Sequence, residues 1–231
     1  MKIVVIHGTN HKGSTYNVSK ILTDKIEGEV KEFFLPRDFG EFCLGCTQCF
    51  MKDEKLCPHH EKRDIITKEL IEADVIILES PVYVYHVTGA MKAFLDHYGY
   101  MWMPHRPHPS MFKKQAVVIS TAAGAGMKST NKDMADSLFF LGVAKTYKLG
   151  FAVRATSFKG VSSKIKAKIE KKTTKVAKLI KKRNGKVKVG FKTKAFFSIM
   201  RMIEKNGFNP VDVAYWKENG WLDKNRPWKN K

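Results

Sequence analysis

Five short runs rich in β-branched residues alternate with segments of helical periodicity along the first two thirds of the chain. The runs begin at Lys2, Glu29, Val75, Ala116 and Lys145. Runs of this length and composition are typical of strands buried on both faces of a parallel sheet. Parallel strands need crossover connections, and helices that supply them cover both faces of the sheet. We therefore expect an α/β fold with a doubly wound, five-stranded parallel sheet.

Loops of small and polar residues follow three of these strands, at residues 8–17, 80–87 and 121–126. In such sheets, ligands bind beyond the carboxyl ends of the strands, so we expect the three loops to converge on one ligand. The first loop leads into a helix that begins between Ser14 and Asn17, where unpaired backbone N–H groups favour an anion. It lacks the Gly-Lys-Ser/Thr of a Walker loop and the Gly-x-Gly-x-x-Gly pattern. A phosphate cradle and an ordinary capped turn both fit this loop.

Positive charge is concentrated in the last third of the chain. The net charge is +20, but residues 1–150 carry 19 Lys and Arg against 17 Asp and Glu, whereas residues 151–231 carry 23 against 5. Such a surface can contact nucleic acid, anionic lipid or an acidic protein. Basic and aromatic residues do not interleave on one face there, which disfavours nucleic acid.

The basic third divides into an amphipathic helix and an extension. Residues 162–182 have helical periodicity with a Lys-rich face, and residues 186–194 form a basic, β-prone segment. The segment that follows is too apolar to remain exposed alone. We expect a first domain over 1–183 and an extension over 184–231, anchored by Trp216 and Trp221 on the domain or on a second subunit.

All four cysteines fall in one short stretch with the spacing C-x2-C-x2-C-x7-C: Cys43, Cys46, Cys49 and Cys57. Three close cysteines and a more distant fourth are typical of a [4Fe–4S] cluster, whereas zinc sites usually split into two knuckles. Free thiols are the alternative, and the sequence leaves this choice open. We interpret His105 and His108 as rim residues near the ligand, and His59 and His60 as residues without a metal.

No apolar run approaches the length of about 20 residues that a membrane-spanning helix needs. The chain begins with a strand instead of a charged region followed by an apolar core, so we expect no secretory signal and a cytoplasmic location.

Three segments together resemble a known family. Residues 8–17 (GTNHKGSTYN), residues 80–83 (SPVY) with residues 91–96 (MKAFLD), and residues 120–124 (STAAG) are similar to the flavodoxin-like NAD(P)H-dependent FMN reductases. The cysteine run resembles the iron–sulfur flavoprotein branch of that group. The resemblance covers about residues 1–150 and implies a flavodoxin-like fold that binds FMN.

The resemblance also implies which residues hold FMN. The phosphate would contact the first loop and the start of its helix, the ring would rest on the second loop, and the third loop would close the other edge. The implied residues are Thr9, His11, Ser14, Tyr16 and Asn17 for the phosphate, and Pro81, Val82, Tyr83, Val84, Thr121, Ala122 and Gly124 for the ring. Two positions depart from the family, because members often carry Arg where this chain has His11 and His97.

The resemblance implies an oxidoreductase in which NAD(P)H reduces FMN and a small acceptor such as a quinone or flavin takes the electrons. We identify no residue as catalytic, because the cofactor performs the chemistry. The alternative is an electron carrier that holds FMN and a [4Fe–4S] cluster on Cys43, Cys46, Cys49 and Cys57 and docks ferredoxin. We also expect a homodimer or a higher homo-oligomer.

Overall fold

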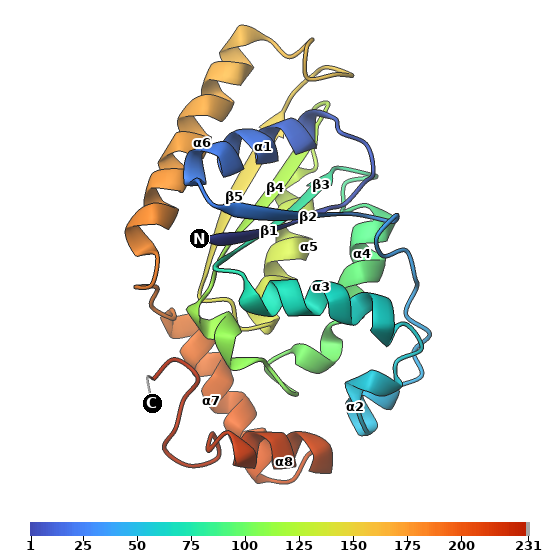
Figure 1. Ribbon diagram of the computed structural model, residues 1–231, viewed down its shortest axis with the longest axis vertical. Helices are drawn as coiled ribbons and strands as arrows, with labels where there is room; N and C mark the ends of the chain where they lie inside the picture. The colour runs from blue at the N-terminus through green and yellow to red at the C-terminus, as the bar shows by residue number, and fades with distance from the viewer. Residues whose placement is uncertain (230–231) are drawn as a thin grey trace.

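A five-stranded parallel sheet forms the centre of the computed structural model, which describes residues 1–229 (Figure 1). Its strand order is β2-β1-β3-β4-β5, the order of flavodoxin-like folds, and this confirms the predicted fold class. The strands are β1 (Lys2–His7), β2 (Glu29–Phe34), β3 (Val75–Pro81), β4 (Gln115–Ala122) and β5 (Lys145–Ala152).

Helices cover both faces of the sheet (Figure 1). On one face, α1 (Ser14–Ile26) and α6 (Ser163–Arg183) pack against Ile3 and Val5 of β1. On the other, α3 (His60–Glu72), α4 (Gly89–Asp96) and α5 (Met127–Phe140) pack against Val4 and Ile6. The alternation along β1 places successive side chains in two separate cores, as the pleat requires.

The connections contain shorter elements. These are α2 (Gln48–Met51) and the 3₁₀ helices η1 (Glu54–Leu56), η2 (Gly99–Met101) and η3 (Pro109–Lys113). Helix α5 begins at Met127, directly after Gly126, whose φ of +94° ends the preceding loop. A residue with a Cβ is strained at that φ, so this glycine sets the start of the helix.

A third core joins the C-terminal extension to the sheet domain. Helices α7 (Phe191–Lys205) and α8 (Pro210–Glu218) lie at the lower end of the molecule in Figure 1. Phe197 stacks on Trp216 at 4.6 Å between ring centroids, and both rings are fully buried together with Trp221. This core includes Phe112 and Ala144, which precede β4 and β5. The extension therefore packs at the amino ends of the strands, opposite the three predicted ligand loops; the 183/184 boundary stays a prediction.

The interpretation of residues 186–194 as a β-prone segment is wrong. No strand forms there, and α7 begins inside the segment at Phe191. Val187 and Val189 instead contribute their side chains to the third core. Their apolar character serves packing between the domain and the extension, a use that local β propensity does not distinguish from strand pairing.

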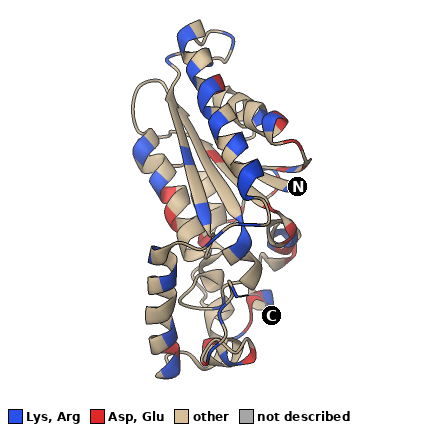
Figure 2. Cartoon of the chain, turned by 90° about the vertical axis from the view of Figure 1, so that its left-hand side faces the viewer, with Lys and Arg blue, Asp and Glu red and all other residues tan. Residues whose placement is uncertain are grey.

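Lys residues recur along α6 (Figure 2), and most of them are exposed. The apolar side of this helix buries Ile169, Val176 and Ile180 against the sheet. Among the described residues, no helix is both long enough and apolar enough to cross a bilayer.

Candidate functional site

The predicted loops converge on one pocket at the carboxyl ends of the strands. A fourth segment, which follows β5, completes it; sequence reasoning missed this segment because its composition is not distinctive. The residues that line the pocket are Thr9, His11, Gly13, Ser14, Thr15, Pro81, Val82, Tyr83, Thr121, Ala122, Ala123, Val153, Ala155 and Thr156. Four stretches far apart in the chain therefore share one cavity, as the strand order requires.

Hydrogen bonds between the loops fix the pocket. The hydroxyl of Thr15 lies 2.7 Å from the hydroxyl of Thr121, and Thr88 donates its hydroxyl hydrogen to the carbonyl of Gly8 at 2.6 Å. The backbone N–H of Val82 donates to the carbonyl of Thr121 at 2.9 Å. These bonds are buried or partly buried, so they hold the loops in a preformed arrangement.

The start of α1 offers a cradle for an anion. Its N-cap is Gly13, which has no side chain to accept hydrogen bonds, and its first turn contains no acidic residue. Within residues 1–229, the N–H groups of Ser14, Thr15 and Tyr16 donate to no acceptor. A Cβ at residue 13 would lie 2.8 Å from the ring of the exposed His11 side chain, which would have to shift. Unpaired N–H groups at a helix start attract a phosphate.

Eight of the twelve residues implied for FMN line the pocket, namely Thr9, His11, Ser14, Pro81, Val82, Tyr83, Thr121 and Ala122. The other four lie outside its lining, and their role stays a prediction. Asn17 donates to the carbonyl of Gly13 at 2.7 Å, and Tyr16 packs 5.3 Å from the ring of His7. The Val84 side chain is 93% exposed, and Gly124 borders open space with no atom within 4 Å of a Cβ placed there.

His7, at the end of β1, and Glu79, in β3, form a buried polar pair next to the first loop. Nδ1 of His7 is 2.7 Å from a carboxylate oxygen of Glu79, and Nε2 of His7 is 3.0 Å from Glu32. Burial raises the pKa of Glu79, and the bond to His7 opposes that rise. The sequence signal was available, because His7 and Glu79 directly follow the apolar runs of residues 3–6 and 75–78.

The four cysteine thiols are free and occupy one neighbourhood. Cys43 and Cys46 are exposed, whereas Cys49 and Cys57 are partly buried. Burial raises the pKa of the Cys49 thiol, and the nearby thiols of Cys57, Cys43 and Cys46 raise it further. Four cysteine thiols are the ligands that a [4Fe–4S] cluster requires, although a cluster itself stays a prediction.

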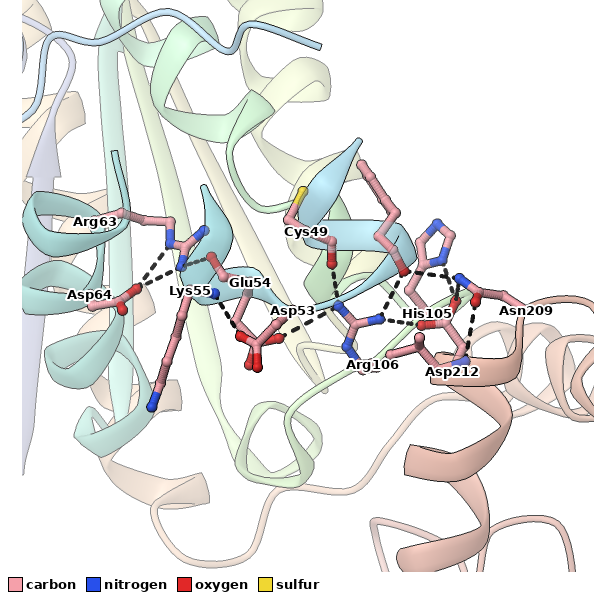
Figure 3. Close-up of polar contacts among 12 residues, drawn as sticks. Cys49, Asp53, Glu54, Lys55, Arg63, Asp64, His105, Arg106, Asn209 and Asp212 are labelled. Carbon is pink, nitrogen blue, oxygen red and sulfur yellow. Dashed lines mark hydrogen bonds and ion pairs between the residues drawn. The ribbon is translucent and has the colours of Figure 1, made fainter. Parts of the chain in front are cut away.

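An ion network ties this cysteine loop to the extension (Figure 3). The guanidinium of Arg106 donates to the carbonyl of Cys49 and to the fully buried carboxylate of Asp212 in α8. Nδ1 of His105 lies 2.7 Å from the same carboxylate. The interpretation of His105 and His108 as rim residues of the ligand pocket is wrong, because neither lines it. His108 instead contacts Ser110 at 2.9 Å, and both histidines support the loop that meets α8.

A family model described as NADPH-dependent FMN reductase matches residues 1–155. The chain belongs to this family. Its match spans the sheet and the loops that form the pocket, whereas α6 and the extension lie beyond it.

Curated relatives of this FMN reductase family member include iron–sulfur flavoproteins. One from Archaeoglobus fulgidus is 31% identical over 132 residues, which are 54% of this chain and 56% of the relative. Another from Methanocaldococcus jannaschii is 34% identical over 99 residues, which are 42% of this chain and 50% of the relative. The chain thus spans about half the length of the curated relatives it matches.

Solved structures support the fold. A flavone reductase superposes with a TM-score of 0.60 at 19% identity, covering 82% of this chain and 66% of that chain. An FMN-dependent NADH-azoreductase from Bacillus anthracis, solved in complex with FMN, gives a TM-score of 0.56 at 12% identity, covering 78% of this chain and all of that chain (100%). Similarities at these identities establish that the chain shares the flavodoxin-like architecture.

Proposed function

We propose that this protein is an FMN-dependent oxidoreductase that passes reducing equivalents from NAD(P)H to a small acceptor such as a quinone or a free flavin. The observation that carries the proposal is the pocket in which three loops meet beside the unpaired N–H groups of Ser14, Thr15 and Tyr16. Family membership and this anion cradle point to the same ligand.

The residues of the pocket divide into two groups by chemistry. Thr9, His11 and Ser14 offer neutral hydroxyls and an imidazole next to the start of α1, which suits the phosphate group of FMN. Pro81, Val82 and Ala122 offer apolar surface and close backbone, which suits a flat ring. Bound FMN would supply the hydride and electron chemistry.

The turn after β3 lines the pocket with a backbone that is fixed by hydrogen bonds and a side chain that is exposed to solvent. Tyr83 and His86 exchange two backbone hydrogen bonds of 3.0 Å, and His86 lies 2.9 Å from the carboxylate of Asp133 in α5. The Tyr83 side chain is nevertheless 56% exposed. An exposed aromatic side chain on a fixed turn suits contact with a second ligand such as NAD(P)H or the acceptor.

A second candidate function is an iron–sulfur flavoprotein that carries electrons. Two observations favour it, the shared neighbourhood of four free thiols and the curated relatives that are named iron–sulfur flavoproteins. Cys43, Cys46, Cys49 and Cys57 would hold the cluster, which exchanges single electrons. The basic outer surface of α6 would attract an acidic protein such as ferredoxin (Figure 2).

Large apolar side chains surround the cysteine loop and favour the proposal of a homodimer. Phe42, Leu44, Met51 and Leu56 are 50–71% exposed. Grouped apolar side chains of this size usually mark an interaction surface. A solution mass of two chains supports the proposal, and a monomer at high protein concentration contradicts it.

The choice of electron donor separates the two functions. Protein loaded with FMN is mixed anaerobically with NADPH, with NADH or with reduced ferredoxin, and flavin bleaching is followed by absorbance. Rapid bleaching by a nicotinamide nucleotide supports the reductase. Bleaching by ferredoxin alone contradicts it and supports the carrier.

A further inference from the structure

Three potential metal ligands outside the flavin pocket come together beside the cysteine loop. Cys57 follows η1, His59 immediately precedes α3, and His97 immediately follows α4. One ligand atom from each of them lies within 4.8 Å of the other two. His59 Nδ1 and His97 Nε2 are 3.0 Å apart. Residues 38 positions apart in the chain thus direct ring nitrogens at one point.

The ring of His97 is held in the orientation that a metal ligand needs. Its Nδ1 lies 2.8 Å from the carbonyl oxygen of Ala93, which can only accept, so Nδ1 carries a proton. The lone pair of this buried ring is therefore on Nε2, the atom that faces His59. Phe39 packs edge-on against the ring at 4.8 Å. A histidine that donates its second N–H to a carbonyl is the usual arrangement around a bound metal.

The surrounding charges are already paired. The guanidinium of buried Arg63 bonds to Asp64 at 2.7 Å and to the carbonyl of Glu54 at 3.0 Å. The carboxylate of Glu41, which lies near both imidazoles, bonds to Lys62 at 2.7 Å. A Cys57 thiolate is consequently the anionic ligand that these three side chains offer to a cation.

We propose that Cys57, His59 and His97 bind a Zn²⁺ ion. A tetrahedral ion with Zn–N distances of about 2.0–2.1 Å and a Zn–S distance of about 2.3 Å places its ligand atoms roughly 3.3–3.6 Å apart, so only small side-chain movements are needed. One thiolate and two imidazoles leave the fourth position to water or a further ligand. The proposal is independent of FMN binding.

The ion and a four-cysteine cluster exclude each other, because both use Cys57. Zinc at this position would leave Cys43, Cys46 and Cys49 with three thiolates, one fewer than the four that a [4Fe–4S] cluster takes. The protein would then exist in two metal states, and the supply of iron or zinc during folding would select between them.

Cobalt titration of the full-length, metal-free protein tests the site. Under anaerobic conditions with a phosphine reductant, we expect one equivalent of Co²⁺ to give tetrahedral d–d bands and a thiolate-to-cobalt charge-transfer band. Zn²⁺ should then displace the cobalt. Absence of any spectroscopic change with Co²⁺, together with no heat from Zn²⁺ in calorimetry, overturns the proposal.

Three ligand variants and two control variants assign the ligands. His59→Gln should weaken Co²⁺ binding at least ~100-fold, since it removes a ligand and even outer partners cost 10–100-fold. Cys57→Ser should abolish the charge-transfer band. His60→Gln changes the adjacent histidine outside the group and should bind as the wild type does, and Cys43→Ser should do so too. Loss of cobalt binding in Cys43→Ser would place the ion on the four cysteines and overturn the proposal, as would wild-type affinity in His59→Gln. Circular dichroism melts identify any variant that fails to fold, and His97→Gln then provides the second ligand deletion.

Discussion

The hydroxyl of Thr15, in the first turn of α1, lies 2.7 Å from the hydroxyl of Thr121, near the end of β4. This buried contact joins residues 106 positions apart and connects the anion cradle to the third loop of the pocket. Both side chains also line the pocket. The geometry of the pocket therefore depends on a bond that neither loop can make alone.

Replacing Thr15 with Val should loosen the pocket while keeping the shape of the side chain. The hydroxyl of Thr121 then loses its partner, which costs about 1–3 kcal/mol for a buried polar group. We expect FMN affinity to fall roughly 10-fold, in line with about 1.4 kcal/mol. FMN fluorescence quenching measures this. Thr173→Val, which removes a hydrogen bond inside α6, is the control, and equal affinity in both variants would contradict the role of Thr15.

Gly124 provides a test of the third loop that does not disturb folding. A Cβ there would meet no atom within 4 Å, so Gly124→Leu should melt close to the wild-type temperature. The family resemblance implies that Gly124 lies beside the flavin ring, so a leucine there should obstruct the ring and weaken FMN binding by about 10-fold or more. Gly190→Leu, at a similarly open position before α7, should leave FMN binding unchanged. Unaltered FMN affinity in Gly124→Leu would remove Gly124 from the site.

The sheet and its ligand loops could be predicted from sequence because their signals are local. A run such as residues 3–6 is apolar along its length, and a parallel sheet places the loops after its strands at one edge. The segment from Val153 to Thr156 completes the pocket but carries no comparable signal. Its role follows from the position of β5 at the edge of the sheet, which composition does not reveal.

The contacts of the extension could not be predicted, because they depend on how distant segments meet. Arg106 and Asp212 belong to a loop and a helix with no common pattern. The approach of His59 to His97 likewise depends on how α3 and α4 pack on the same face of the sheet. Sequence reasoning treated these histidines one at a time and so assigned them no joint role.

A substitution of Asp212 tests how much the contacts between the extension and the domain contribute to the free energy of unfolding. Asp212→Asn removes the charge that pairs with buried Arg106 and His105. Removing one partner of a buried ion pair typically costs about 3–5 kcal/mol, so the urea midpoint should fall markedly. The exposed Asp223→Asn serves as the control and should shift the midpoint little. Equal midpoints for the two variants would show that the network does not stabilise the fold.

Glu204 should make the stability of the protein depend on pH. Its carboxylate in α7 is 1% exposed and has no hydrogen-bond partner within residues 1–229. Burial and, to a smaller extent, the nearby carboxylate of Asp212 raise the pKa of Glu204 to about 7. In the folded state, the Glu204 carboxyl therefore keeps its proton up to about pH 7. In the unfolded state, where its pKa is ~4.3, the carboxyl loses the proton at lower pH. The contribution of Glu204 to the free energy of unfolding is fully present below about pH 4.3 and is lost as the pH rises towards 7.

The variant Glu204→Gln should abolish this pH dependence. At pH 8, we expect it to be more stable than the wild type by about 1–3 kcal/mol, and at pH 4 we expect similar stability. Urea unfolding at the two pH values measures both differences. Glu218→Gln, at an exposed position in α8, is the control. A stabilisation that is the same at pH 4 and pH 8 would contradict the assignment.

Flavin binding tests the central claim most directly. Purified protein is stripped of any ligand and titrated anaerobically with FMN, with the flavin spectrum and fluorescence followed together. The account predicts saturation at one FMN per chain, weaker binding of riboflavin because it lacks the phosphate for the α1 cradle, and bleaching of the bound flavin by NADPH or NADH. Failure of FMN to bind, or equal affinity for FMN and riboflavin, would contradict it.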